Sequence, residues 1–280
     1  KSPKKLKIWL QGGLHGNEPG GSEGLFMLID YLLHQEEGNR LLQQMDIALL
    51  PVANVDGYIA QKRVSSSGFD LNRDQTKFAD PVSGIIKQAF IRWNPDAAFD
   101  FHEYQPNRKE YTELTEGGVT GYYDVLFLPS GNQNIPECLR KMTTQLFQRQ
   151  AEKSLDSIGY SHSLYFSPIA KVSGLQLALG GKSPQSSSTS YALSNAVSML
   201  IEIRGIGLGR TSVARRTNCC FVVAKSFLET ASVHSEELKN VVEKAEEQTI
   251  NRENNIVVTA EEPLVTLPVK FIDIKKNEVI

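Results

Sequence analysis

The sequence predicts an α/β protein, a three-layer sandwich around a mixed, mostly parallel central sheet. Segments typical of strands and of helices alternate along the 280 residues. The strand segments are short, continuous apolar runs, as expected for a sheet that is covered on both faces. Polar clusters follow several of these runs, at the edge where open α/β sheets bind ligands.

Five segments read as buried strands because each is a short apolar run. The first ends in glycines, and the second is closed by the turn signal NVDG. The third, AAFDFHE, and the last, within AVSMLIEIRG, carry acidic or histidine side chains near their ends. In chain order the predicted strands are residues 5–13, 46–52, 97–103, 123–130 and 196–205.

Four segments read as helices from their periodicity. Ser22 is the expected N-cap of the first, and Asp80 lies near the cap of the second. Pro136 fits the first turn of the third, and Gly159 fits its end. In chain order the predicted helices are residues 22–35, 80–93, 136–159 and a basic stretch over 211–247.

Two further segments lack this regular pattern. Residues 180–190 (GGKSPQSSSTS) are rich in Ser and Gly, which predicts a mobile surface loop. Residues 256–274 are strand-like but contain Pro263 and Pro268, so they are expected to add edge strands or to begin a further module.

Composition restricts the class of partner. Hydrophobic residues make up 40% and charged residues 22%, which is typical of a globular chain. A net charge of -2 gives no basic field for nucleic acid, and no apolar run is long enough to cross a membrane. The three cysteines lack a CxxC spacing and are interpreted as small buried residues or inert thiols.

His15 and Glu18 lie three positions apart in the loop GGLHGNEPGG, directly after the first predicted strand. Glycines allow that loop to bend, so both side chains can face one ion. His102 ends the third strand and would supply a third ligand. Two histidines and one carboxylate form a common catalytic zinc set that leaves a position for water.

Glu202 lies inside the apolar strand SMLIEIRG, where an acid is costly unless it is paired or used. A carboxylate beside a zinc site can take a proton from a water that the metal acidifies. The competing interpretation is a buried ion pair with Arg204. For His102 the ordinary alternative is a core histidine. Asp100, two residues earlier, points to the same face of the strand and is a candidate to orient a zinc-bound His102 through its other ring nitrogen.

The ordered motifs HGNE, NVDG, GFDLNRD, DFHEY and IEIRG resemble the zinc carboxypeptidases of the carboxypeptidase A type. The resemblance runs from about residue 5 to residue 207 and implies a carboxypeptidase-like fold. It also implies one zinc ion held by His15, Glu18 and His102, with Glu202 as the general base. The implied catalytic domain covers residues 1–250, followed by a strand-rich tail over 251–280. The sequence itself does not give the compartment, and the resemblance favours a secreted or periplasmic location.

The resemblance also assigns roles in substrate binding. Arg63 would polarise the scissile carbonyl and stabilise the oxyanion. Asn72 and Arg73 would hold the free C-terminal carboxylate of a peptide. Tyr191 is the nearest candidate for a tyrosine that closes over the substrate, although it lies closer to Glu202 than the family spacing implies.

Three functions compete. The first is a metallocarboxypeptidase acting on peptides. The second is an amidohydrolase of N-acyl amino acids, since GGLHGNEPGG and DLNR also resemble the aspartoacylases and succinylglutamate desuccinylases. The third is a binding module without catalysis. The long segment between His102 and Glu202 leaves room for a peptide-binding wall and favours the peptidase.

Overall fold

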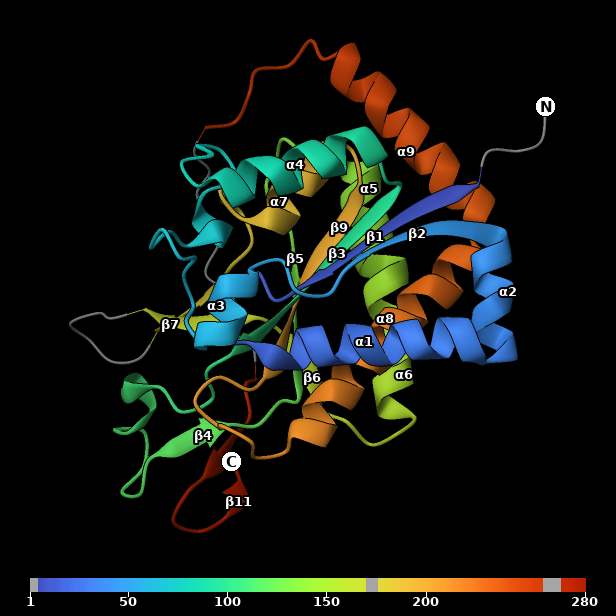
Figure 1. Cartoon of the computed structure of the whole chain (residues 1–280). Coiled ribbons are helices and arrows are strands. Elements are labelled where there is room, and N and C mark those ends of the chain that lie inside the picture. The colour runs from blue at the N-terminus through green and yellow to red at the C-terminus, as the bar shows by residue number, and fades with distance from the viewer. Residues whose placement is uncertain (1–4, 170–175, 259–267) are drawn as a thin grey trace.

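The computed structural model describes residues 5–169, 176–258 and 268–280. Its centre is a six-stranded sheet in the order β2-β1-β3-β9-β5-β6 (Figure 1). Every neighbouring pair is parallel except β5 with β9, so the predicted mixed, mostly parallel sheet is confirmed. The strands are β1 (Leu6–Gly12), β2 (Met45–Leu50), β3 (Ala97–Tyr104), β5 (Val125–Pro129), β6 (His162–Leu164) and β9 (Val197–Arg204).

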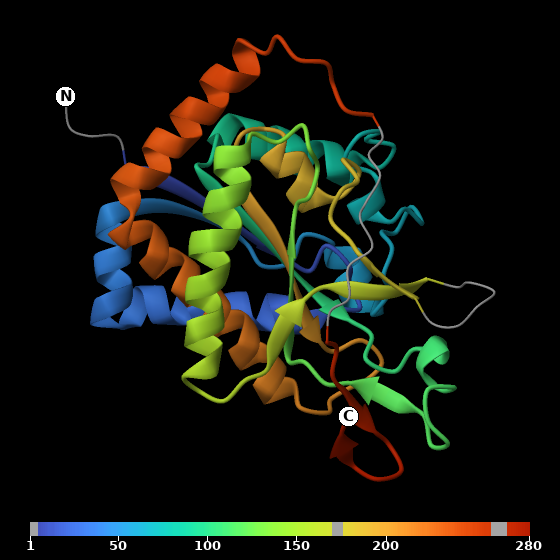
Figure 2. The same ribbon diagram turned by 180° about the vertical axis from the view of Figure 1, so that it is seen from behind.

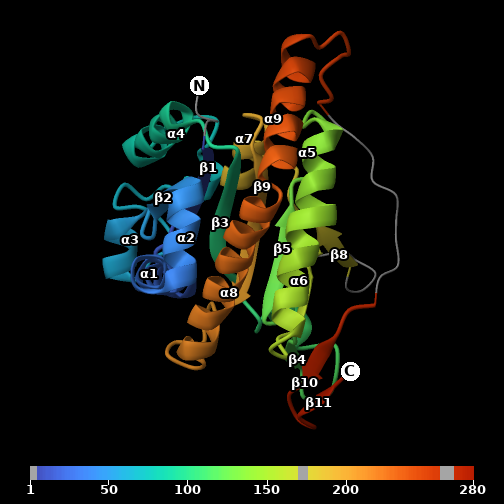
Figure 3. The ribbon, with the colours of Figure 1, turned by 90° about the vertical axis from the view of Figure 1, so that its right-hand side faces the viewer.

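Helices cover both faces of the sheet, which confirms the three layers. One face carries a large group of helices, among which α8 and the α5–α6 stretch lie side by side (Figures 2 and 3). They are α1 (Pro19–His34), α2 (Glu36–Gln44), α5 (Glu137–Met142), the π-helical η3 (Thr143–Gln148), α6 (Arg149–Asp156), α8 (Val213–Val233) and α9 (Ser235–Ile250). The opposite face carries α4 (Pro81–Trp93) and α7 (Ser187–Ala192).

The hydrophobic core is divided by the sheet into two parts. Alternate residues of one strand point to opposite faces. Ile8 and Leu10 of β1 therefore belong to the large cluster under α1 and α8, whereas Trp9 joins the cluster under α4 and α7. Both faces of β1 are thus apolar, which explains why the strand appears in the sequence as a continuous apolar run.

The predicted N-terminal cap is confirmed for α4 and is wrong for α1. Asp80 caps α4 as expected, with its Oδ1 accepting the Val82 N–H at 2.8 Å. The prediction for Ser22 is wrong, because α1 begins at Pro19 and Ser22 is buried inside the helix. Proline fits the first turn of a helix, where its missing N–H is not needed. The helix therefore begins at Pro19, three residues before Ser22.

The prediction of a mobile Ser-rich surface loop is wrong for the second half of residues 180–190. Ser187–Ala192 form α7, and the side chains of Ser187 and Thr189 are buried. Serine and threonine are small enough to pack closely against the sheet, provided that their hydroxyl groups find partners. A segment whose composition is typical of loops therefore forms a helix that packs against the sheet beside the site.

The remaining elements are short. The C-terminal β10 pairs antiparallel with β4 and with β11 in a separate three-stranded sheet, rather than with the central sheet. Residues 259–267 of the predicted strand-like tail, Pro263 included, lie outside the described residues. These short elements are α3 (Val55–Ala60), η1 (Leu71–Arg73), η2 (Lys109–Tyr111), β4 (Val119–Gly121), β7 (Phe166–Ile169), β8 (Gln176–Leu179), β10 (Phe271–Asp273) and β11 (Glu278–Val279).

Two expectations from composition can be compared with the fold. All three cysteines are free, and burial raises the pKa of the Cys219 thiol to about 12, which makes it inert as expected. Within residues 5–169, 176–258 and 268–280, no helix has both the length and the apolar character needed to cross a membrane.

Candidate metal centre and active site

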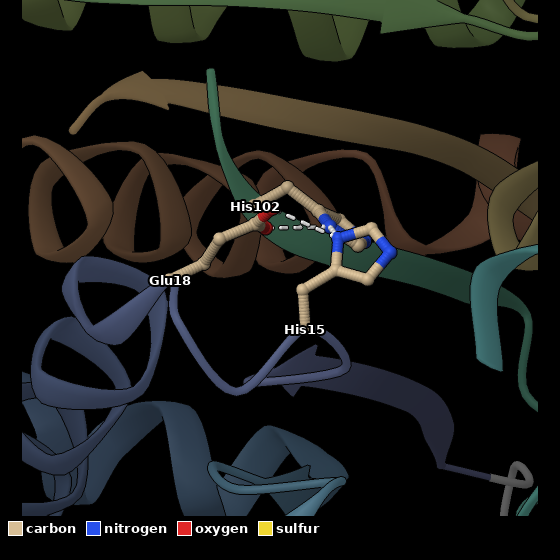
Figure 4. A group of neighbouring side chains, drawn as sticks. All are labelled: His15, Glu18 and His102. Carbon is tan, nitrogen blue, oxygen red and sulfur yellow. Dashed lines mark hydrogen bonds and ion pairs between the residues drawn. The ribbon is translucent and has the colours of Figure 1, made fainter. Parts of the chain in front are cut away.

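Three side chains from two segments of the chain converge on one point. His15 comes from the loop after β1, Glu18 from the start of α1, and His102 from β3 (Figure 4). His15 Nδ1 lies 2.9 Å from Glu18 Oε1, and His102 Nδ1 lies 2.9 Å from Glu18 Oε2. The two Nδ1 atoms are 3.1 Å apart. Two ring nitrogens and a carboxylate that converge in this way can hold a metal ion.

Glycines shape the loop that presents His15 and Glu18. Gly13 has a φ of +64°, a left-handed conformation that side chains rarely adopt. A Cβ at Gly16 would lie 1.9 Å from the carbonyl carbon of Gly57, so only glycine fits there. The Glu18 N–H then donates to the His15 carbonyl at 3.2 Å and closes the turn. The predicted bend is confirmed.

Each histidine is held from behind by a carboxylate. His15 Nε2 lies 2.9 Å from Asp70 Oδ1, and His102 Nε2 lies 2.9 Å from Asp100 Oδ2. A ring N–H that donates to a carboxylate leaves the Nδ1 lone pair facing the convergence point. The predicted contact of Asp100 is confirmed, whereas sequence reasoning missed Asp70, although it lies in the DLNRD motif.

The electrostatics keep the cluster charged. Burial opposes ionisation of Glu18, but the charge and hydrogen bonds of His15 and His102 outweigh it and hold its pKa well below the usual range. Burial likewise opposes the charge on His102, but Asp100 and Glu18 raise its pKa, so the ring would have to release a proton for its Nδ1 to bind a metal. The donor set, the carboxylate-backed rings and the ionised Glu18 all fit zinc.

Glu202 lies beside this cluster. It is the register partner of His102 on the parallel strand β9 and is partly exposed in the pocket. Burial, followed by the charge of Glu18, raises its pKa to about 7. Its Oε2 atom has no hydrogen-bond partner among the described residues.

The ordinary alternative for Glu202 does not apply. Arg204 donates instead to the Gly121 carbonyl at 2.8 Å and to Thr120 Oγ1 at 3.1 Å. Glu202 therefore has an environment that suits proton transfer better than a structural ion pair.

Arg63 reaches the cluster from the loop after α3. Its Nε and Nη2 atoms each lie 3.0 Å from Asp70 Oδ2, and its Nη1 lies 3.3 Å from Glu18 Oε1. The side chain is 40% exposed and lines the same pocket as Glu202. Asp70 thus orients both His15 and Arg63, one with each carboxylate oxygen.

Asn72 and Arg73 form the short helix η1, which Asp70 caps through the Asn72 N–H. Asn72 Oδ1 accepts the Ser187 N–H at 2.8 Å, so its Nδ2 is the group that can donate to a ligand. Arg73 is exposed and, with Asn72, lines the pocket, which has a volume of ≈ 540 Å³. The structure therefore brings both residues to the cluster.

The prediction for Tyr191 is wrong. Its side chain is fully buried, its hydroxyl donates to Gln11 Oε1 at 2.8 Å, and its ring stacks on Phe90 with centroids 4.1 Å apart. It fills the core between the sheet and α4 and does not line the pocket. Tyr104 and Tyr165 line the pocket instead, and Tyr165, which directly follows β6, is a residue that sequence reasoning missed.

The Ser-rich segment supports the site through α7. The Ser187 hydroxyl donates to Asp100, which holds His102, while the Ser187 N–H holds Asn72. One residue thus links the metal cluster to the pair proposed for substrate binding. The buried serine explains why this segment folds against the sheet.

Comparisons with known proteins agree with this geometry. Residues 1–168 match the family model described as zinc carboxypeptidase. The chain belongs to the zinc carboxypeptidase family. It is 34% identical over 266 residues to a "Probable carboxypeptidase 2" of Arthroderma benhamiae. The matched region covers 94% of this chain and 50% of that protein. It is 33% identical over 272 residues to "Carboxypeptidase 2" of Trichophyton rubrum, covering 94% and 49%. The chain spans about half the length of the curated relatives it matches.

Two solved structures of similar fold are metallo-carboxypeptidases by name. One is a metallo-carboxypeptidase of Pseudomonas aeruginosa in complex with (2-guanidinoethylmercapto)succinic acid, with a TM-score of 0.59, 20% identity and coverage of 85% of this chain and 60% of that one. Another, from Burkholderia cenocepacia, has a TM-score of 0.61, 15% identity and coverage of 83% and 58%. At these identities the likeness establishes the fold.

Proposed function

We propose that this chain carries the catalytic domain of a metallocarboxypeptidase, within residues 1–250, which hydrolyses the C-terminal peptide bond of its substrate. One observation supports this most directly. A metal-binding cluster, a carboxylate beside it and an Asn–Arg pair line a single pocket. His15, Glu18 and His102 would hold one zinc ion, which supplies polarisation of the scissile carbonyl and acidification of a water.

Glu202 is the proposed general base. Its carboxylate takes a proton from the attacking water and then delivers it to the leaving amine. A base whose pKa lies near the working pH is effective in both directions, and burial raises the pKa of Glu202 to about 7. Arg63, oriented by Asp70, offers a fixed positive charge to the oxyanion that develops on the carbonyl.

Asn72 and Arg73 are the proposed clamp for the free carboxylate of the substrate. Arginine binds a carboxylate through two parallel N–H donors, and the Asn72 amide adds another. Because Ser187 fixes Asn72 Oδ1, the amide donor is held in place before the substrate arrives. Such a clamp explains how the enzyme would select a chain end.

The pocket wall favours a peptide over an N-acyl amino acid as substrate. Tyr165, Pro168 and Gln185 line it, and all three come from the long segment between β3 and β9. The volume of ≈ 540 Å³ has room for side chains on both sides of the scissile bond. The alternative, an aspartoacylase-like or desuccinylase-like amidohydrolase, uses the same chemistry in the same cluster.

Parallel kinetics test the proposal. Zinc-loaded protein is assayed on blocked dipeptides with free C-termini and on N-acyl amino acids, acyl-aspartate and succinyl-glutamate included. We expect cleavage of the dipeptides. A strong preference for the N-acyl amino acids would favour the amidohydrolase. If the protein hydrolyses neither class, and Glu202→Gln leaves peptide binding unchanged, a binding module explains the fold better.

A further inference from the structure

The carboxylates that line the active-site pocket already have a function or a partner, so they are not available to bind a substrate side chain. Three carboxylates face the pocket. Glu18 belongs to the metal cluster, Glu202 is the proposed base, and Glu103 forms a buried pair with Arg216, both of its oxygens 2.7 Å from the guanidinium. No carboxylate in the described pocket wall is therefore left to receive a basic side chain of the substrate.

Arg108 is the positive charge in the same wall that the proposed mechanism does not use. It precedes η2, in the loop after β3, and its side chain is half-buried. Arg63 is paired with Asp70, and Arg73 belongs to the proposed clamp. Within residues 5–169, 176–258 and 268–280, none of the ion pairs involves Arg108. A guanidinium that lines a pocket without a carboxylate partner suits a carboxylate on the ligand.

Tyr165 connects Arg108 to the rest of the site. Burial, followed by the charge of Glu202, raises the pKa of Tyr165 to about 12, against a hydrogen bond from Arg108 and the charge of Arg73. The hydroxyl therefore stays protonated and lies within electrostatic reach of Arg73, Arg108 and Glu202. Arg108 and Tyr165 thus line the same pocket as the metal cluster and Glu202.

We propose that Arg108 recognises a second carboxylate on the substrate, so that the enzyme prefers peptides with an acidic side chain next to the scissile bond. This inference rests on the proposed function, because it assigns the α-carboxylate to Asn72 and Arg73. The acidic side chain belongs either to the last residue or to the one before it. In both cases Arg108 supplies the recognising charge, and Tyr165 holds the guanidinium.

Paired peptides and a matched variant test this. Blocked dipeptides that end in Glu, Gln or Leu probe the last position, and peptides with Glu or Gln before a common last residue probe the other. Arg108→Gln removes the charge. Lys109→Gln removes an equal charge from the exposed neighbouring residue, which does not line the pocket. Since Arg108 is partly exposed, we expect about a tenfold preference in kcat/KM for Glu over Gln at one position.

The preference should disappear in Arg108→Gln and remain in Lys109→Gln. Arg108→Glu should reverse it and favour a basic residue at the same position. Equal kcat/KM for Glu and Gln at both positions would overturn the inference, as would a Leu preference that Arg108→Gln leaves unchanged. An acidic preference that survives in Arg108→Gln would assign recognition to another group.

Calorimetry in the Glu202→Gln background separates this inference from the proposed function. We expect the favoured Glu peptide to bind about tenfold tighter than its Gln counterpart, and Arg108→Gln to remove the difference. If the wild type hydrolyses no peptide but this binding difference is present, the proposed function fails and the recognition by Arg108 stands. If peptides are hydrolysed and the binding difference is absent, the proposed function stands and the recognition by Arg108 fails.

Discussion

Asp70 is expected to control zinc affinity, because one oxygen holds His15 together with the Asn72 N–H and the other holds Arg63. Oδ1 accepts from His15 Nε2 at 2.9 Å, and Oδ2 accepts from Arg63 Nε at 3.0 Å. An asparagine has the same shape but only one acceptor oxygen. In Asp70→Asn the amide NH₂ must therefore face one of two groups. If it faces His15, the ring nitrogen there must accept a hydrogen bond, and the ring lone pair turns away from the metal. If it faces Arg63, two donors meet without an acceptor.

The size of the expected loss in zinc affinity follows from losing one charge-assisted hydrogen bond, the one between Asp70 and the metal ligand His15. Such changes lower metal affinity about 10- to 100-fold, or about 1.4 to 2.8 kcal/mol. Competition with a chromophoric chelator measures the zinc Kd. Asp74→Asn is the matched control in the same loop, because its carboxylate accepts the Ala79 and Asp80 N–H groups and, among the described residues, holds no site histidine. Zinc affinity within twofold of the parent in Asp70→Asn, or an equal loss in Asp74→Asn, would refute the reasoning.

Four further predictions concern catalysis, its pH dependence, the metal loop and the corrected tyrosine. Glu202→Gln should lower kcat by about 10²- to 10⁴-fold while zinc content by atomic absorption stays at the parent value; a variant that keeps full activity would exclude Glu202 as the base. Because the base must be ionised, kcat/KM should fall as the pH drops through the pKa of Glu202, and the acid limb should have its midpoint between about 4.5 and about 7. Gly16→Ala should destabilise the fold by several kcal/mol in urea melts, since the added Cβ meets backbone at 1.9 Å. The control is Gly84→Ala in α4, where the added Cβ would lie 4.0 Å from Phe78 Cβ; it should stabilise the fold by about 0.5–1 kcal/mol. Tyr191→Phe should cost about 1 kcal/mol of stability through the lost hydrogen bond and leave KM unchanged; a raised KM would restore Tyr191 to the substrate site.

The central sheet and the metal cluster could be predicted because few physical rules govern them. Continuous apolar runs predict strands buried on both faces, and parallel strands bring their carboxyl ends to one edge. His102 and Glu202, far apart in the sequence, were expected at that edge and are register partners on β3 and β9. The HGNE loop follows β1 directly, so its placement depends only on a short turn.

The other parts of the site depend on packing, which local sequence patterns do not encode. Tyr191 lies in a Ser-rich stretch that suggests a loop, yet its ring fills a gap beside Phe90 in the core. Ser187 is buried because Asp100 and Asn72 offer it partners from other segments. Tyr165 reaches the pocket wall through the path of the chain after β6, which no motif in the sequence marks.

The most direct test of the account is a zinc titration of metal-stripped protein, followed by hydrolysis of a blocked dipeptide with a free C-terminus. The same dipeptide with an amidated C-terminus is the comparison. We predict that activity rises to a plateau at one equivalent of zinc and that the amidated peptide is cleaved far more slowly, because Asn72 and Arg73 lose their carboxylate. Activity that does not depend on added metal, or equal cleavage of both peptides, would contradict the account.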